Sequence, residues 1–362
     1  MTVIINKPGF NLRETLTSLK RKIGIKGAEL MAAETVSDVY NVIGTNRNKI
    51  INGAMVIDQR NAGASVTTSV LQSATYVLDR WAYYNDVVSK RTIQQVSTAP
   101  AGFTNSMLVT VIATDTVGPQ QFVYQAIEGL NASNLGWGTS SANNCTLSFW
   151  VRSSVTGQMG GSIQNYNSAR SYPFAYTINT ANTWEYKTVN ISGDTSGTWL
   201  TTNGIGVRLI FENGPGYQAS PAGSWVSLNS TTSTGSVNLC ATNGATWYIT
   251  GVQFEVGTQA TPFHWRPFGT ELQLCQRYYE RVSFSGSGYY NGGNGLAYTI
   301  PYKVPKRATP SLALAGTDWG SWAVNFGNWN PAVSGDAVYV NVVGVSVGFV
   351  RWGDIAIIIS EL

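Results

Sequence analysis

The sequence contains few charged residues. Only 12% of its 362 residues are Asp, Glu, Lys or Arg, about half the share usual in globular proteins. The net charge is +4, and no basic run is longer than Lys20-Arg21-Lys22. Because nucleic-acid binders concentrate Lys and Arg on one face, we expect no nucleic-acid partner.

Cysteine and histidine are also scarce. Cys145, Cys240 and Cys275 lie far apart, and His264 is the one histidine. With no Cys-x-x-Cys pair and no second histidine, the sequence predicts neither a zinc site nor a redox motif. We expect the cysteines to be buried. The sequence leaves open whether two of them form a disulfide. His264, flanked by aromatic residues and prolines, is expected to be a packed or interface residue.

The acidic residues are few and scattered, and they number 19. Glycosidases need two facing carboxylates, which a sequence cannot place, so a glycan-degrading enzyme stays an alternative. A weak calcium candidate comprises Asp58, Asp79, Asp115, Asp194 and Glu212, but no Asp-x-Asp loop is present. No nucleophile elbow or phosphate-binding glycine loop occurs. We therefore expect no catalytic residues, metal or cofactor.

No apolar run approaches the ~20 residues of a membrane-spanning helix. Met1 to Lys7 are followed by polar sequence and not by the apolar core of a signal peptide. We expect a protein that neither inserts into a membrane nor is exported by such a peptide.

Small polar and aromatic residues are abundant instead. The chain has 38 Gly, 12 Trp and 18 Tyr, and 43% of its residues are hydrophobic. Gly and Asn tolerate tight turns, and aromatic residues pack well on pleated surfaces. The composition predicts a mainly β protein with a substantial core.

Residues 1–49 contain the one region with clear helical periodicity. Asn11 and Glu14 form a capping box, and Gly24 and Gly44 end two short helices. Their apolar stripes comprise Leu12, Leu16, Leu19 and Ile23, then Val36, Val39, Tyr40 and Ile43. These stripes have no core of their own, so we expect them to dock on the next domain, a partner or a symmetry mate.

Residues 50–269 predict a jelly-roll β-sandwich of many short strands joined by turns. The expected strands are Ile50–Asp58, Tyr76–Trp81, Thr92–Val96, Ser106–Ile112, Gln121–Ile127, Thr146–Val151, Gly161–Tyr166, Trp184–Ile191, Gly206–Phe211, Ser224–Leu228 and Thr246–Val256.

Residues 270–362 predict a small C-terminal β domain. A short helix is expected at Glu271–Tyr279 and a glycine-rich loop at Gly286–Gly295. The expected strands are Leu296–Val304, Ser311–Leu314, Trp322–Phe326, Ala337–Val343, Val345–Trp352 and Asp354–Ile359. So thin a core favours oligomerisation, and we expect a homotrimer.

Aromatic residues beside Gly, Asn and Ser are the one positive chemical signal. Exposed rings stack on sugar faces while amides and hydroxyls bond sugar hydroxyls; core or interface packing is the alternative for each ring. The candidate glycan-binding residues are Trp137, Tyr217, Tyr289, Tyr290, Trp319, Trp322 and Trp329.

Several stretches together resemble a family of virion structural proteins from marine and cyanobacterial phages. They are Asn48–Arg60, Tyr76–Trp81, Gly251–Phe263, Glu271–Tyr279 and the ending Ser360-Glu361-Leu362. The resemblance implies a trimeric fibre or appendage with a carbohydrate-module-like jelly roll and a distal C-terminal domain.

The resemblance further implies that residues 1–45 attach the chain to another virion protein. The expected role is a tail fibre that mediates host attachment, with surface glycan as receptor and the virion as location. A head fibre or capsid decoration protein is the first alternative, a glycan depolymerase the next, and a secreted carbohydrate-binding module the last.

Overall fold

The computed structural model describes residues 27, 31, 47–88, 90–117, 120–292, 296–314, 326–333, 337–344 and 348–362. The chain divides into two units, Met1–Arg47 and Asn48–Leu362. The expected anchoring stripes from Leu12 to Ile43 lie outside the described residues. All of the described sheets belong to the second unit.

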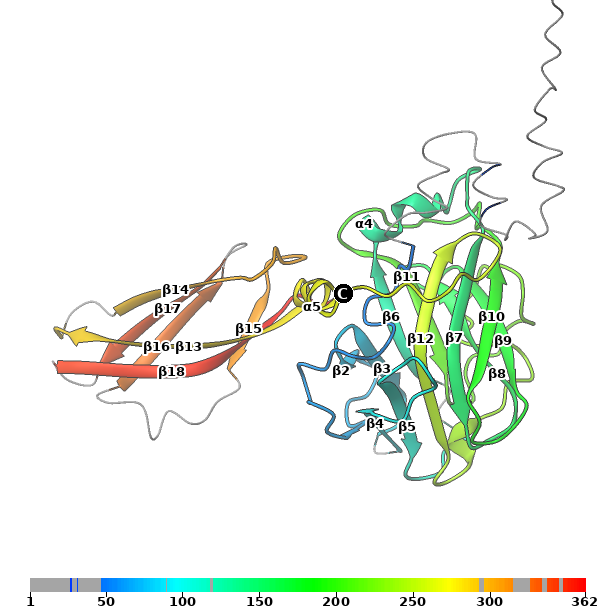
Figure 1. Cartoon of the computed structure of the whole chain (residues 1–362), viewed down its shortest axis with the longest axis horizontal. Coiled ribbons are helices and arrows are strands. Elements are labelled where there is room, and N and C mark those ends of the chain that lie inside the picture. Colours follow the sequence, from blue (N-terminus) through cyan, green and yellow to red (C-terminus); the bar gives the residue numbers. More distant parts are fainter. Residues whose placement is uncertain are drawn as a thin grey trace, which may run out of the picture. The chain divides into compact units, whose positions relative to one another are not determined.

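Two antiparallel sheets form a β-sandwich, which confirms the mainly β prediction (Figure 1). The first sheet, in spatial order, contains β1 (Val66–Thr67), β4 (Arg91–Val96), β5 (Ser106–Val111), β12 (Thr246–Val256), β7 (Cys145–Ser153) and β10 (Glu185–Ile191). The second contains β2 (Thr75–Leu78), β3 (Trp81–Asn85), β6 (Gln121–Glu128), β11 (Ile205–Glu212), β8 (Gly157–Gln164) and β9 (Ser171–Ile178). The short helices α4 (Gly129–Ala132), η1 (Ser133–Leu135) and η2 (Leu239–Ala241) lie in the connections.

The core lies between the sheets because alternate residues of each strand point inward. Leu147, Phe149 and Val151 of β7 are fully buried, as are Leu209 and Phe211 of β11. Each such side chain contributes about 1.5–3 kcal/mol on burial.

Two expected strands are absent from the described sandwich. Residues 50–58 form turns instead, in which Asn48 Oδ1 accepts hydrogen bonds from the Ile50 and Phe254 amides and Asn52 takes a φ of 57°. In Ser224–Leu228, only Val226 forms an isolated bridge, with Ser171. Conversely, β9 was not predicted; it carries Pro173, which an edge strand tolerates.

The C-terminal region begins with α5 (Phe268–Gln276). Its described strands form one sheet of β13 (Tyr279–Tyr290), β18 (Gly348–Ile359) and β15 (Ser311–Leu314), and another of β14 (Leu296–Pro301), β17 (Ala337–Gly344) and β16 (Phe326–Val333). The predicted loop at Gly286–Gly295 is wrong over its first half, because β13 pairs with β18 as far as Tyr290. The two strands expected within 345–359 are one continuous β18.

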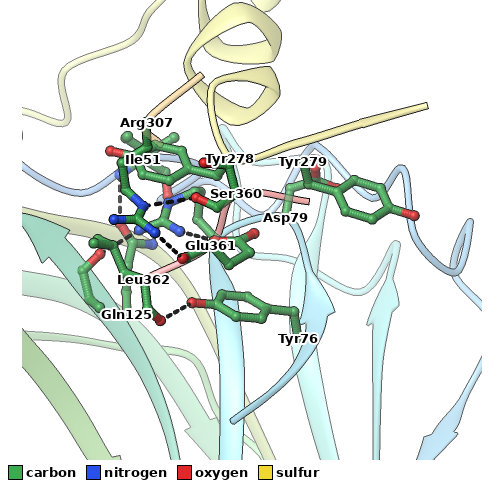
Figure 2. Close-up of polar contacts among 12 residues, drawn as sticks. Ile51, Tyr76, Asp79, Gln125, Tyr278, Tyr279, Arg307, Ser360, Glu361 and Leu362 are labelled. Atoms are coloured by element: carbon green, nitrogen blue, oxygen red, sulfur yellow. Dashed lines mark hydrogen bonds and ion pairs between the residues drawn. The ribbon is translucent and has the colours of Figure 1, made fainter. Parts of the chain in front are cut away.

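The last residues of the chain are bound to the sandwich. The Glu361 carboxylate pairs with the Arg60 and Arg80 guanidinium groups, and the Tyr76 hydroxyl donates to the Leu362 carbonyl at 3.0 Å. Arg307 donates to the carbonyls of Ser360 and Glu361 at 2.8 and 2.7 Å (Figure 2). Arg80 is buried, so its charge depends on Glu361 for compensation.

Candidate glycan-binding cleft

A cleft of about 360 Å³ lies on the outer face of the sheet β2-β3-β6-β11-β8-β9. Its described lining comprises Gln72, Ser73, Ala74, Tyr84, Gln120, Phe122, Tyr124, Gln164, Ser168, Ile205, Arg208, Asn229, Thr231 and Leu362. The volume lies in the range of small-molecule sites, about 300–1,000 Å³. Amides, hydroxyls and aromatic rings dominate the lining.

The floor of the cleft is aromatic because β3 and β6 place rings on their outward-facing positions. Val123 and Ile127 of β6 face the core, whereas Phe122 and Tyr124 face outward. Tyr84 of β3 stacks on Phe122 with ring centroids 5.2 Å apart and planes at 7°. Tyr84 is the partly exposed member of this pair, so its ring is the one that a sugar can reach.

Arg208 of β11 is the one charged side chain among the described lining residues. Its guanidinium lies 5.7 Å from the centre of the Tyr124 ring and donates to the Ser168 hydroxyl at 3.2 Å. Its Nε atom is buried without a hydrogen-bond partner in the described part of the chain. The side chain as a whole is partly exposed, so the outer nitrogens of the guanidinium can donate to a ligand oxygen.

One wall of the cleft comes from the long segment between β11 and η2. This segment is held in place by two bonds between Tyr217 and Thr231: the Tyr217 amide donates to Thr231 Oγ1 at 2.8 Å, and the Thr231 amide donates to the Tyr217 carbonyl at 3.0 Å. Gln164 of β8 ties the wall to the sheet by donating to Asn229 Oδ1 at 2.9 Å. The wall is thus ordered without belonging to a sheet.

The tyrosine hydroxyls of the cleft are neutral donors at neutral pH. Burial raises the pKa of Tyr84, and the Asp86 carboxylate and Tyr217 raise it further. Burial also raises the pKa of Tyr124, against the opposing effect of Arg208. Each phenol can therefore both donate and accept a hydrogen bond.

The glycan-binding candidates that the sequence predicts are not gathered in one place in the structure. Tyr217 is 40% exposed and lies near Tyr84, whose pKa it raises. Tyr289 is 65% exposed and Tyr290 is buried; both lie at the end of β13. Trp319 and Trp322 lie outside the described residues, and only the backbone of Trp329 is described, in β16.

Trp137 is a core residue and needs correction as a glycan candidate. Its ring is 6% exposed and makes edge-to-face contacts with Trp199, Trp225 and Phe254 at 4.8, 5.2 and 5.9 Å. Its indole N–H donates to the Asn143 carbonyl at 2.8 Å. Neither face of this ring is available to a sugar.

The calcium candidates are not brought together. In the described ranges no group of three acidic, His or Cys side chains could hold a metal ion. Asp194 pairs with Arg170 at 2.6 Å, Asp79 accepts from Gln59 at 2.7 Å, and Glu212 accepts from the Gln121 amide at 2.8 Å. Each of these three carboxylates has a structural partner.

The cysteines are free and buried, so the open question of a disulfide is answered. Burial raises the pKa of the Cys145 thiol to about 12 and that of Cys240 to about 11. Both thiols are therefore protonated and uncharged at neutral pH, and they pack as small apolar side chains.

Within the described ranges, no helix has both the length and the hydropathy needed to span a membrane.

The sequence reasoning missed Tyr84, Phe122, Tyr124 and Arg208. A usable signal was the alternation in Gln121–Glu128, where aromatic residues two apart face away from Val123 and Ile127. What the alternation could not reveal is that β11 and the wall segment close around those rings.

Among the comparisons with known proteins, similarity is found to solved structures but not to family models or curated proteins. No family model matches the chain, and no curated protein matches it. The active domain of tailspike protein 4 from bacteriophage CBA120 is similar with 13% identity and a TM-score of 0.31, over 58% of this chain and 21% of that one. A putative sugar-binding protein of Bacteroides thetaiotaomicron is similar with 14% identity and a TM-score of 0.33, over 58% of this chain and 100% of that one.

The C-terminal family 22 carbohydrate-binding module of Clostridium thermocellum Xyn10B is also similar, with 12% identity and a TM-score of 0.30. It is matched over 56% of this chain and 99% of its own. At these identities and TM-scores the likeness assigns neither a family nor an activity to this chain.

Proposed function

We propose that the chain is a bacteriophage tail-fibre protein that attaches the virion to its host by binding a surface glycan in the cleft. The observation that carries the proposal is the cleft itself, with Tyr84, Arg208 and a wall of amides and hydroxyls on an ordered sheet. The resemblance of Asn48–Arg60 and Gly251–Phe263 to phage virion proteins supports the virion location.

Binding in the cleft combines stacking with hydrogen bonding. A pyranose ring lies against Tyr84, where dispersion and C–H contacts stabilise it. The amides of Gln72, Gln120 and Asn229 are in the lining and supply partners for sugar hydroxyls. Arg208 donates to a ring oxygen or an acidic substituent.

The protein acts by binding and not by catalysis. Glycoside cleavage requires two carboxylates flanking the bond, whereas no Asp or Glu side chain is among the described residues of the lining. The functional form is a homotrimer attached to another virion protein through residues 1–45.

A glycan array tests the cleft directly. The substitutions Tyr84→Ala and Arg208→Met remove the stacking surface and the charge, and each is expected to weaken binding about tenfold, or about 1.4 kcal/mol. Leu130→Ala and Lys303→Gln, at exposed positions outside the cleft, are the matched controls and should bind as wild type. Unchanged binding by both cleft variants would overturn the assignment.

Gold-labelled antibody on intact virions tests the location separately. Label on tail appendages is the expected result. Label scattered over the capsid would replace the tail fibre with a head fibre or decoration protein, and would leave the cleft assignment intact.

A further inference from the structure

A second hollow, of about 690 Å³, lies on the outer face of the other sheet, over β12, β7 and β10. Figure 1 shows these three strands side by side. Its aromatic lining, here named the aromatic groove, comprises Phe103, Trp150, Tyr186, Phe263 and Trp265. The aromatic groove and the cleft lie on different sheets of the sandwich and share no lining residue.

The rings of the aromatic groove form two contiguous groups. Trp150 and Tyr186 are directly opposed on β7 and β10, with centroids 5.4 Å apart. Phe103, Phe263 and Trp265 contact one another at 4.8–5.2 Å. Tyr186 and Trp265 are 44% and 53% exposed, so each group presents a ring to solvent.

The backbone beneath these rings is adapted to hold them. The register of β12 against β7 shifts between Thr250 and Gln253, and Gly251 in this bulge takes a φ of 63°. A Cβ atom at Gly251 would lie 2.7 Å from the Phe103 ring and 3.2 Å from the Trp150 ring. Glycine at this bulge therefore lets both rings lie against the strand.

The chemistry of the lining favours an uncharged, hydroxylated ligand. None of the described residues that line the aromatic groove carries a charge, whereas Ser148 and Thr261 bring hydroxyls to it. Rings with interspersed hydroxyls match the apolar faces and equatorial hydroxyls of a pyranose.

We infer that the aromatic groove is a second carbohydrate site, which takes a neutral glycan chain across Tyr186 and Trp265. The molecule then carries two sites of different selectivity: the cleft, with Arg208, and the aromatic groove, with no charge. Once one site has bound a polysaccharide, the effective concentration of polysaccharide at the second site rises. Two sites on one particle therefore strengthen attachment to a polysaccharide layer.

Affinity electrophoresis in gels containing mixed-linkage β-glucan, arabinoxylan, galactomannan or dextran tests the inference. The proteins are the full chain, a groove variant (Tyr186→Ala with Trp265→Ala) and a cleft variant (Tyr84→Ala with Arg208→Met). We expect at least one of these neutral polysaccharides to retard the cleft variant, and the groove variant to bind it at least tenfold more weakly than wild type.

Each other outcome decides between the two sites. Binding lost in the cleft variant alone overturns the second site and leaves the first. Failure of all four polysaccharides to retard the wild-type chain also overturns the second site. If the groove substitutions change the oligomeric mass by light scattering while every affinity stays within twofold, the aromatic groove is an interface between copies, and the inference fails.

Discussion

At the scale of single residues, Trp137 shows that the neighbours of an aromatic residue in sequence do not decide whether its ring is exposed. Its neighbours Gly136 and Gly138 suggested an exposed ring, but both take positive φ values so that the ring turns into the core. Trp137→Ala is expected to lower the free energy of unfolding by about 3–5 kcal/mol, because it empties a space within an aromatic cluster. Urea denaturation measures this, and glycan binding by the folded variant should equal that of wild type.

Asp79 makes stability depend on pH. Burial raises the pKa of its carboxyl from 3.8 to about 6, against the lowering effects of Arg60 and Gln59. Between these values the folded state holds a proton that the unfolded state has released, so this contribution to stability falls as pH rises from about 4 to about 6.

The Asp79→Asn variant should lack that dependence. The free energy of unfolding of wild type, relative to the variant, is expected to fall by about 3 kcal/mol across this window and then to stay constant above it. Urea denaturation at half-unit steps from pH 4 to 8 measures the difference. A difference that rises with pH would contradict the burial of the Asp79 carboxyl.

Residue-scale prediction from sequence succeeded where a residue's own chemistry decides its environment. The cysteines were expected to be buried and are. It failed for Tyr84 and Arg208, because their role depends on strands that lie 124 positions apart in sequence, the difference between 208 and 84. Strand order in the sheet, and not local pattern, brings them together.

At the scale of elements, β8 is a glycine-rich strand that is paired on both sides, with β11 and with the edge strand β9. A Cβ atom on Gly161 would lie 1.9 Å from the Ile210 carbonyl oxygen and 2.6 Å from the Phe174 ring. Gly161→Ala is therefore expected to cost more than about 2 kcal/mol of stability. Gly269→Ala, in α5 with nothing within 4 Å, is the matched control, expected to be neutral or to stabilise by up to about 1 kcal/mol. Equal thermal shifts would contradict this packing.

The C-terminal residues form the second element with a testable role. Glu361→Ala leaves the buried Arg80 charge without its carboxylate and should destabilise the chain by about 3–5 kcal/mol. Lys303→Gln removes a half-exposed partner of Glu280 at 3.8 Å and should cost less than about 1 kcal/mol. Denaturant unfolding compares the two, and similar losses would show that the Glu361 pairs contribute little.

Alternation predicted the strands whose two faces differ in exposure, such as β4, β5 and β10. It missed β13 because alternating Ser and Gly give no apolar face, and its pairing with β18 depends on backbone bonds instead. The apolar residues of 50–58 predict a strand, but in the structure they are buried in turns and not in extended backbone. The apolar pattern of a sequence alone does not distinguish a buried turn from a buried strand.

At the scale of the whole molecule, the sandwich has a core of its own. Deleting residues 1–45 is expected to leave its unfolding transition and its glycan affinity unchanged, because the chain divides into two units at Arg47 and the core cluster of the described residues runs from Ile50 onward. The same deletion should abolish incorporation into virions. Light scattering of both forms measures whether the trimer needs this segment, and loss of sandwich folding on deletion would count against the proposed division of roles.

The most direct measurement of the central claim is hydrogen–deuterium exchange with and without the glycan that binds best on the array. The cleft assignment predicts slower exchange in peptides of β3, β6 and β11 that contain Tyr84, Tyr124 and Arg208, and in the wall around Thr231. Saturating glycan that leaves exchange in all these peptides unchanged would contradict it.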